Sequence, residues 1–331
     1  MNRNSLLTSK DEAVSAVKTA FAILPRKLIT DALNVGILAI AVTALAFSPI
    51  LTKLSEIELS PVATIFNRLW IATVVISFWQ LIKMAGSSSV EQAKSSNNDR
   101  QQGLLFLASF CATSSAVLWA ISLTQTSVAS STVLRSCTPL FISLQAWLIL
   151  KQCFSYQFIV GMLLSIAGGM AIGWDDLQLS RDYLIGDSIA LLSAALHGVN
   201  IVIIGYLRDR GCPTEKVLLW RCAGGALMVL PVVYLTDLQM FPSSLQGWLT
   251  IIALAVVCQT FGQGLLVHSL RQFSACFVGV FALLKPAITA LLAWIIFAED
   301  ISLTSGIALV LILIGIYLAR SNDSPTSERS W

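Results

Sequence analysis

Charged residues are scarce in this sequence: only 12% of its 331 residues are Asp, Glu, Lys or Arg, whereas 56% are hydrophobic. A soluble domain usually carries about 25% charged residues. The hydrophobic residues also occur in runs that are too long and too uniform for helices with one face in water. These features exclude an ordinary soluble globular protein and indicate a polytopic membrane protein.

Motifs for metal, nucleotide or nucleophile chemistry are also missing. The seven cysteines show no CxxC or other metal-ligand spacing. The sequence has no Walker, GxSxG or HExxH pattern, and no pair of carboxylates lies deep in a hydrophobic run. We therefore expect no enzyme activity, no cofactor, no metal and no nucleic-acid partner.

Ten hydrophobic segments have about the length that a helix needs to cross a bilayer. Because open strand edges would leave backbone groups unpaired in lipid, we expect each segment to be helical. The predicted spans are residues 33–51, 61–82, 103–123, 128–150, 156–173, 185–206, 216–236, 247–269, 275–297 and 302–319. Residues 1–32, which lack a classical signal peptide, and residues 321–331 form the two predicted terminal segments.

The distribution of Lys and Arg supports an even number of spans. Four of the 21 basic residues lie within the spans. If the N-terminus is cytoplasmic, fifteen of the others lie on the cytoplasmic side and only Lys53 and Arg181 lie outside. This positive-inside bias predicts that both termini are cytoplasmic.

The chain contains an internal duplication. Ser127–Gly173 and Ser274–Arg320 align without a gap at an offset of 147 residues, with ten identities in 47 positions. Proline, tryptophan and glycine in one register are hard to obtain by chance. Because five helices per repeat is an odd number, repeats at 33–173 and 185–320 would be inverted in the membrane. The predicted fold is all-α, with ten transmembrane helices in two inverted five-helix repeats.

Several motifs within these repeats resemble a known family. Each aligned stretch contains the string Pro-(7)-Trp-(7)-Ser-(12)-Gly, beginning at Pro139 and at Pro286. An acidic turn at 299–302 precedes the last helix, and Arg68 and Arg221 lie early in the second and seventh spans. Over residues 33–320 the chain resembles EamA-type members of the drug/metabolite transporter superfamily. The resemblance implies export or exchange of small metabolites without ATP hydrolysis, but no particular metabolite.

The four basic residues within the spans are Arg68, Arg135, Arg221 and Lys285. A charge at the bilayer centre costs at least about 2.5–3.5 kcal/mol on insertion scales, so it needs a reason to be there. No Asp or Glu lies deep in a span. Many EamA-type members have an acidic or neutral residue before the second proline, so Lys285 departs from the commoner pattern.

Arg135 and Lys285 precede Pro139 and Pro286 and could approach one cavity from opposite sides. A dry cavity with two cations and no acid favours an anionic substrate. Alternatively, each cation binds the helix carbonyls that the prolines free. Arg68 and Arg221 are expected near opposite membrane faces, either as scaffold residues that reach the interface or as gate residues that pair with Glu56 or Glu215.

Other polar residues of the spans are candidates for lining the site. His197 and Asn200 lie three apart on one helical face, and Gln259 and Gln263 lie four apart in the eighth span. Trp119, with Ser115, could form an aromatic wall. Each of these residues could instead hold helices together.

Three functions fit these features. The first is a secondary transporter, exporter or exchanger, of a small and anionic organic metabolite by alternating access. The second is a proton-coupled exporter of amino acids or amphipathic toxic compounds, with His197 as the titrating group. The third is a non-transporting scaffold or a lipid scramblase. We expect a bacterial inner membrane, with a small-molecule substrate and the lipid bilayer as partners. The sequence leaves open the substrate, the coupling ion, the direction of transport and a homodimeric state.

Overall fold

The computed structural model describes residues 26–86, 99–126, 128–171, 184–236, 239–297 and 303–320. Throughout these ranges the regular secondary structure is helical, and they contain no strand. The acidic turn at 299–302, residues 1–25 of the N-terminal segment and the tail 321–331 lie outside the described residues. Residues 26–32, predicted as part of that N-terminal segment, already belong to the first helix.

The described helices follow the ten predicted segments. They are α2 (Arg26–Ala46) with α3 (Ser48–Ser55), α4 (Pro61–Gly86), α5 (Asp99–Gln125), α6 (Val128–Arg135) with α7 (Thr138–Leu150), α8 (Tyr156–Ala171), α9 (Leu184–Asp209), α10 (Thr214–Thr236), α11 (Leu245–Ala253) with η3 (Leu254–Gly262) and α12 (Gln263–Ser269), α13 (Ala275–Phe281) with α14 (Leu284–Phe297), and α15 (Leu303–Arg320). Within the described part of the chain, seven segments are long and apolar enough to cross a membrane, and three shorter apolar helices, Tyr156–Ala171, Ala275–Thr289 and Gly306–Arg320, accompany them.

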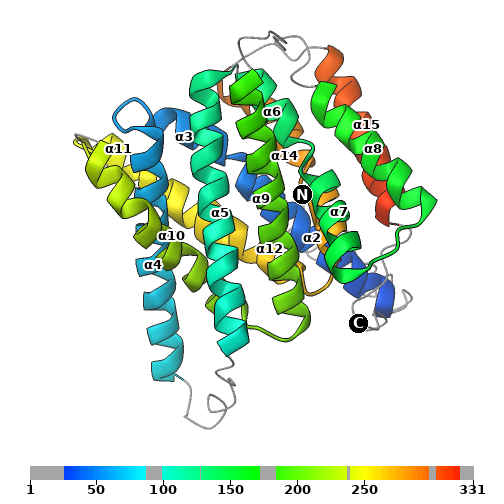
Figure 1. Ribbon diagram of the computed structural model, residues 1–331, viewed down its shortest axis with the longest axis horizontal. Coiled ribbons are helices and arrows are strands. Elements are labelled where there is room, and N and C mark those ends of the chain that lie inside the picture. Colours follow the sequence, from blue (N-terminus) through cyan, green and yellow to red (C-terminus); the bar gives the residue numbers. More distant parts are fainter. Residues whose placement is uncertain are drawn as a thin grey trace, which may run out of the picture.

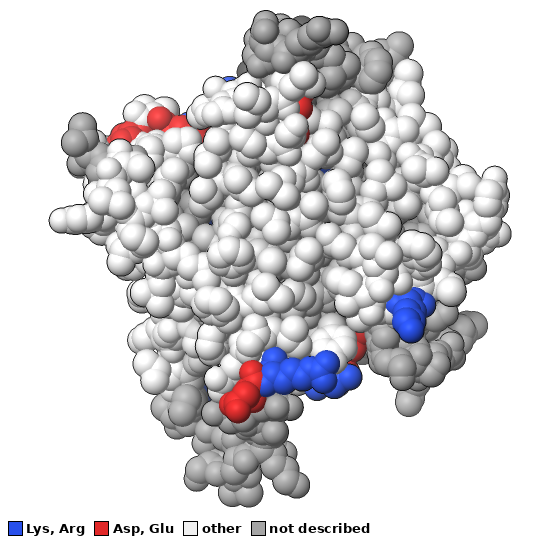
Figure 2. Space-filling model, in the orientation of Figure 1, with Lys and Arg blue, Asp and Glu red and all other residues white. Residues whose placement is uncertain are grey.

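The surface has the banded character of a membrane protein. Figure 1 shows α4, α5 and α9 running along one common direction, with α8 and α15 paired at one side. On the face drawn in Figure 2, Lys and Arg lie mainly along one edge, beside acidic groups, and a wide, almost uncharged belt separates this edge from further acidic groups at the opposite edge. Large apolar side chains such as Phe78, Trp147 and Leu235 are exposed. Such a belt suits contact with lipid chains.

Three of the spans are interrupted near a proline. The first breaks at Phe47, two residues before Pro49, where α2 gives way to α3. The fourth breaks between α6 and α7, immediately before the Thr138-Pro139 pair, and the ninth breaks between α13 and α14, before Pro286. A proline has no N–H to donate and clashes with the carbonyl four residues earlier, so the helix cannot run on unchanged. The last two breaks fall at equivalent places in the two repeats.

The α8–α15 pair shows the internal symmetry directly. A Cβ atom placed on Gly161 would lie 2.5 Å from the carbonyl oxygen of Gly315, and one on Gly168 would lie 2.8 Å from that of Ala308. The 147-residue offset maps Gly161 onto Ala308 and Gly168 onto Gly315. The symmetry between the repeats therefore converts each of these two contacts into the other. Ser165, which maps onto Ile312, donates to the Ile312 carbonyl at 3.4 Å. The pseudo-two-fold axis therefore passes between these two residues.

The remaining helix contacts follow the same symmetry. The first helix of each repeat packs on the third helix of the other, as α2 on η3 and α12, and α9 on α5, and the second helices α4 and α10 pack together. The detail differs between the halves: α5 and α9 are continuous, whereas their counterparts contain the break at Phe47 and the π-helix η3. The two repeats thus share a topology but not a conformation.

One end of the molecule is held by the connection between α10 and α11. The Glu58 carboxylate accepts hydrogen bonds from the N–H groups of Ser243, at 3.1 Å, and of Ser244, at 3.2 Å, and from both serine hydroxyls. The Asn67 amide donates to the Met240 carbonyl at 2.7 Å. Phe241 packs against the rings of Phe66, Trp70 and Trp248. These contacts fasten a loop of the second repeat onto the first.

Candidate substrate site

Arg135, in the last turn of α6, is anchored by neighbouring helices. Its Nη1 donates to Ser193 Oγ on α9 at 2.5 Å, and its guanidinium carbon lies 5.1 Å from the centroid of the Trp119 ring on α5. The Ser115 and Ser193 hydroxyls each donate to the other residue's carbonyl at 2.8 Å. Both serines are fully buried. This network fixes the guanidinium in place with neutral partners and leaves its charge uncompensated.

Arg221, on α10, points inward. Its Nη1 donates to Gln263 Oε1 on α12 at 2.8 Å, and the Arg221 residue is 9% exposed. It does not reach the interface, and it does not pair with Glu215, which instead binds Lys83 at 3.0 Å. Arg221 therefore belongs to the interior, where a neutral amide holds it.

Arg68 and Lys285 have unused hydrogen-bonding capacity. Arg68 Nε is buried without a hydrogen-bond partner. The Lys285 residue is half-buried, and among the described residues no hydrogen-bond or ion-pair partner is found for its ammonium group. A buried donor without a partner costs about 1–3 kcal/mol, so the Arg68 Nε group calls for an explanation.

The four cations share one neighbourhood. Arg135 lies within electrostatic range of Arg68 and Arg221, and Lys285 within range of Arg135 and Arg221. Arg221 is also within range of Arg68, although the backbones of α4 and α10 enter the membrane from opposite ends. The sequence predicts these two arginines near opposite membrane faces, but their side chains bring the two charges within range of each other. The acids of the described helices lie toward helix ends: Asp31, Asp99, Asp187, Asp209 and Glu215.

α9 contributes a polar face to this neighbourhood. Ser193, His197 and Asn200 are spaced four and three apart, so they lie on one side of the helix. His197 is half-buried within range of Arg135, Lys285 and Arg221. Asn200 is fully buried, and neither its Oδ1 nor its Nδ2 has a hydrogen-bond partner. The indole N–H of Trp119 is also unpaired.

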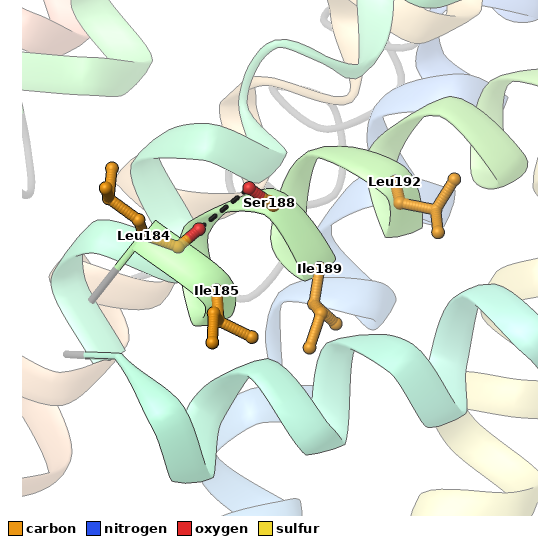
Figure 3. Close-up of a pocket in the computed structure, with 5 residues that line it drawn as sticks. All are labelled: Leu184, Ile185, Ser188, Ile189 and Leu192. Carbon is orange, nitrogen blue, oxygen red and sulfur yellow. Dashed lines mark hydrogen bonds between the residues drawn. The ribbon is translucent and has the colours of Figure 1, made fainter. Parts of the chain in front are cut away.

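A surface groove near the start of α9 is unrelated to the cations. Leu184, Ile185, Ser188, Ile189 and Leu192 line it, as Figure 3 shows. The only polar side chain among them, Ser188, donates to the Leu184 carbonyl of its own helix at 2.7 Å. The groove has no unsatisfied polar group among these residues and suits an acyl chain.

Some partners in the site could not be found from the sequence. Ser193 holds Arg135, but its only signal in the sequence is its position four residues before His197. Thr138, which donates to the Arg135 carbonyl at 2.6 Å, had the weak signal of a hydroxyl beside a helix-breaking proline. Gln259 was expected to share a role with Gln263, but its amide contacts Cys222 Sγ at 3.6 Å instead.

The helices and their symmetry define an integral, multi-pass membrane protein of the inverted-repeat transporter class. The family model described as the EamA-like transporter family matches residues 34–174 and 184–321. The chain therefore belongs to the EamA-like transporter family, within the drug/metabolite transporter superfamily. It is a membrane transporter by family.

Comparisons with individual proteins add the fold alone. No curated protein matches the chain. Among the 29 matching solved chains is one described only as "Crystal structure of protein", which is 19% identical and has a TM-score of 0.71. The match covers 86% of this chain and 95% of that one. At this level of identity the likeness carries no information about the substrate.

Proposed function

We propose that the protein is a secondary transporter, exporter or exchanger, that moves a small organic anion by alternating access. Arg135 and Lys285 bind the anionic group, while His197, Asn200, Gln263 and Trp119 shape the rest of the site. The single observation that carries this proposal is the cluster of four cations in the spans, with Arg221 buried and the other three half-buried, and with no acid beside them among the described residues. Burying unpaired charges is costly, and a bound anion offsets that cost.

The competing explanation was that the two cations bind carbonyls freed by the prolines. The carbonyl four residues before Pro139 belongs to Arg135 and accepts from the Thr138 hydroxyl. The carbonyl four residues before Pro286 belongs to Ala282 and accepts from the backbone N–H of Lys285 at 3.1 Å. Because both carbonyls already have donors, they leave the cationic side chains available to a substrate.

The orientation in the membrane is part of the proposal. We place both termini in the cytoplasm of a bacterial cell, because fifteen basic residues outside the spans then lie inside and two outside. The gathering of Lys and Arg at one edge in Figure 2 supports this assignment.

Counterflow in proteoliposomes tests the proposal. Vesicles loaded with a pool of organic acids and phosphate esters should take up labelled anions, whereas neutral and cationic amino acids should not exchange. Lys285→Gln and Arg135→Gln should each lower anion exchange about 10- to 100-fold, the loss expected for a charged hydrogen bond. Arg210→Gln is the matched control, since Arg210 lies on the Tyr206 ring outside the site.

Two results would contradict the proposal. Undiminished anion exchange by both site variants would remove Arg135 and Lys285 from the binding site. Exchange of cationic substrates alone would remove the charge argument itself. A proton-coupled exporter would show uptake driven by a pH gradient and sensitive to His197→Gln.

A further inference from the structure

We propose that the cargo carries at least two negative charges at one end, and that Arg68 and Arg221 bind it together with Arg135 and Lys285. This inference rests on the proposed anion transport and specifies its substrate class. It also assigns to the cargo site two arginines that the sequence favoured as scaffold or gate residues.

The first argument is the count of uncompensated charge. Arg135 and Arg221 are each held by a neutral group, Ser193 and Gln263, which fixes the geometry without neutralising the cation. Lys285 has no partner among the described residues. A monoanion would leave three of the four cations unbalanced in a medium where charge interactions are much stronger than in water. A group with two or more negative charges balances them better.

The second argument is how the cations are brought together. Ser109 donates to the Arg221 carbonyl at 3.5 Å, and Ser115 bonds to Ser193, which holds Arg135. Both serines lie on α5, which also presents Trp119 to Arg135. A Cβ placed on Gly225 of α10 would contact the side chains of Leu69, beside Arg68, and Thr113 of α5. α5 therefore contacts the backbone at Arg221 and, through Ser193, positions Arg135, while its Thr113 and Leu69, the neighbour of Arg68, meet at Gly225.

The third argument is the unfilled hydrogen bonding. Arg68 Nε and the Trp119 indole N–H are buried donors without partners. Both point to a missing acceptor, and oxygen-rich groups such as phosphate or paired carboxylates supply several acceptors at once. Arginine is well suited to these planar, multidentate contacts.

Asn200 indicates what chemical group the uncharged part of the cargo carries. It lies seven residues beyond Ser193 on the same face of α9, which is about 10 Å along a helix. Its amide has an unpaired donor and an unpaired acceptor, and the residue is fully buried. A hydroxyl or an amide group satisfies both at once. The cargo is thus a phosphate monoester or a di- or tricarboxylate with an uncharged polar body.

Matched pairs of substrates that differ only in charge test this inference. Succinate is compared with its monoamide, succinamate, and glycerol 3-phosphate with its methyl diester, by counterflow in proteoliposomes at pH 7.5. The wild-type protein should exchange the dianion at least about tenfold faster than the monoanion in one of the pairs, as expected when a further charge pair is made. The pair that shows the preference distinguishes carboxylate from phosphate cargo.

Variants test whether Arg68 and Arg221 cause the preference for dianions over monoanions. Arg68→Gln and Arg221→Gln should reduce the dianion preference to about twofold or less, largely by slowing the dianion, whereas Arg210→Gln should keep it. Asn200→Ala should keep the charge preference but lose the preference for malate, which carries a hydroxyl, over succinate. If the glutamine variants do not fold, Arg68→Lys and Arg221→Lys retain the charge and should retain the preference.

The failures are distinguishable. Equal exchange of monoanions and dianions by the wild-type protein would overturn the inference and leave anion transport intact. Exchange of no anion in either pair would overturn both. A dianion preference that survives Arg68→Gln and Arg221→Gln would return these arginines to a structural role.

Discussion

At the scale of single residues, two neighbouring carboxylates have opposite environments. The hydrogen bonds from Ser244 and Ser243 hold the pKa of Glu58 below its ordinary value, with the Ser244 hydroxyl contributing most. Two residues earlier, partial burial raises the pKa of Glu56. Ser244 is also the N-cap of α11, where it accepts from the Gly247 N–H at 2.9 Å. Glu58 therefore joins the α3–α4 turn to the start of a helix in the other repeat.

The pH dependence of stability should differ between these two residues. A lowered pKa in the folded state means that ionised Glu58 stabilises the protein above about pH 4.3, the ordinary value for Glu. That stabilisation is lost as the pH falls through the lower, folded pKa. We expect Glu58→Gln to reduce the thermal midpoint in detergent at pH 6–7, and the difference from wild type to shrink in acid.

Glu56→Gln is the matched comparison and should change in the opposite sense. Because its folded pKa is raised, ionisation of Glu56 weakens the folded state as the pH rises above about 4.3. The glutamine variant should gain stability over wild type toward pH 7 and lose that gain in acid. Parallel pH profiles for the two variants would contradict the assigned environments.

At the scale of helices, the sequence predicted the spans and the interruptions at Pro139 and Pro286, but not the break at Phe47 or the π-helix η3. Length and hydropathy located the ten segments because each must cross the same apolar layer. The π-helix η3 had no signal in the sequence. It packs against α2, where a Cβ on Gly262 would contact Ala44 and Leu45, and Cys258 donates to the Ala44 carbonyl at 3.3 Å.

The candidate site could likewise be predicted only in part from the sequence. The rare cations were visible, but the Arg221–Gln263 and Arg135–Ser193 bonds join residues far apart in the chain.

The α8–α15 contact gives a prediction at this scale. A methyl group at Gly315 would collide with Ser165 and with the Gly161 carbonyl, which are held by the backbone and cannot move aside cheaply. We expect Gly315→Ala to destabilise the protein by about 1–3 kcal/mol, the usual cost of overpacking. Gly306→Ala, on the same helix with nothing within 4 Å, should be neutral or slightly stabilising. Thermal unfolding in detergent measures both, and equal midpoints would contradict the close approach.

At the scale of the whole molecule, the two repeats are fastened to each other at both ends. Lys83 and Glu215 pair where α4 ends and α10 begins. At the opposite end Glu58 holds Ser243 and Ser244. With the proposed orientation, the first contact is cytoplasmic and the second external. An alternating-access cycle must loosen each end in turn.

Labelling from one side of the membrane tests that orientation. Lys53→Cys places a thiol at an exposed position of α3 and should react with a membrane-impermeant maleimide on intact cells. The native Cys153, exposed in the α7–α8 connection, is the internal control and should react only after permeabilisation. The reverse pattern would invert the proposed topology.

The symmetry of the contact between Ser165 and Ile312 determines which distances within the protein can change during transport. When two inverted halves trade their shapes, most distances between them change, but a pair of residues that are each other's image is carried onto itself. Ser165 and Ile312 are fully buried, so labels belong on an exposed image pair of the same two helices, Leu163 and Val310. That pair should report the same separation with and without cargo, and so should change only if the protein unfolds. Labels at positions 83 and 215 should report two separations, and the first pair would calibrate the second.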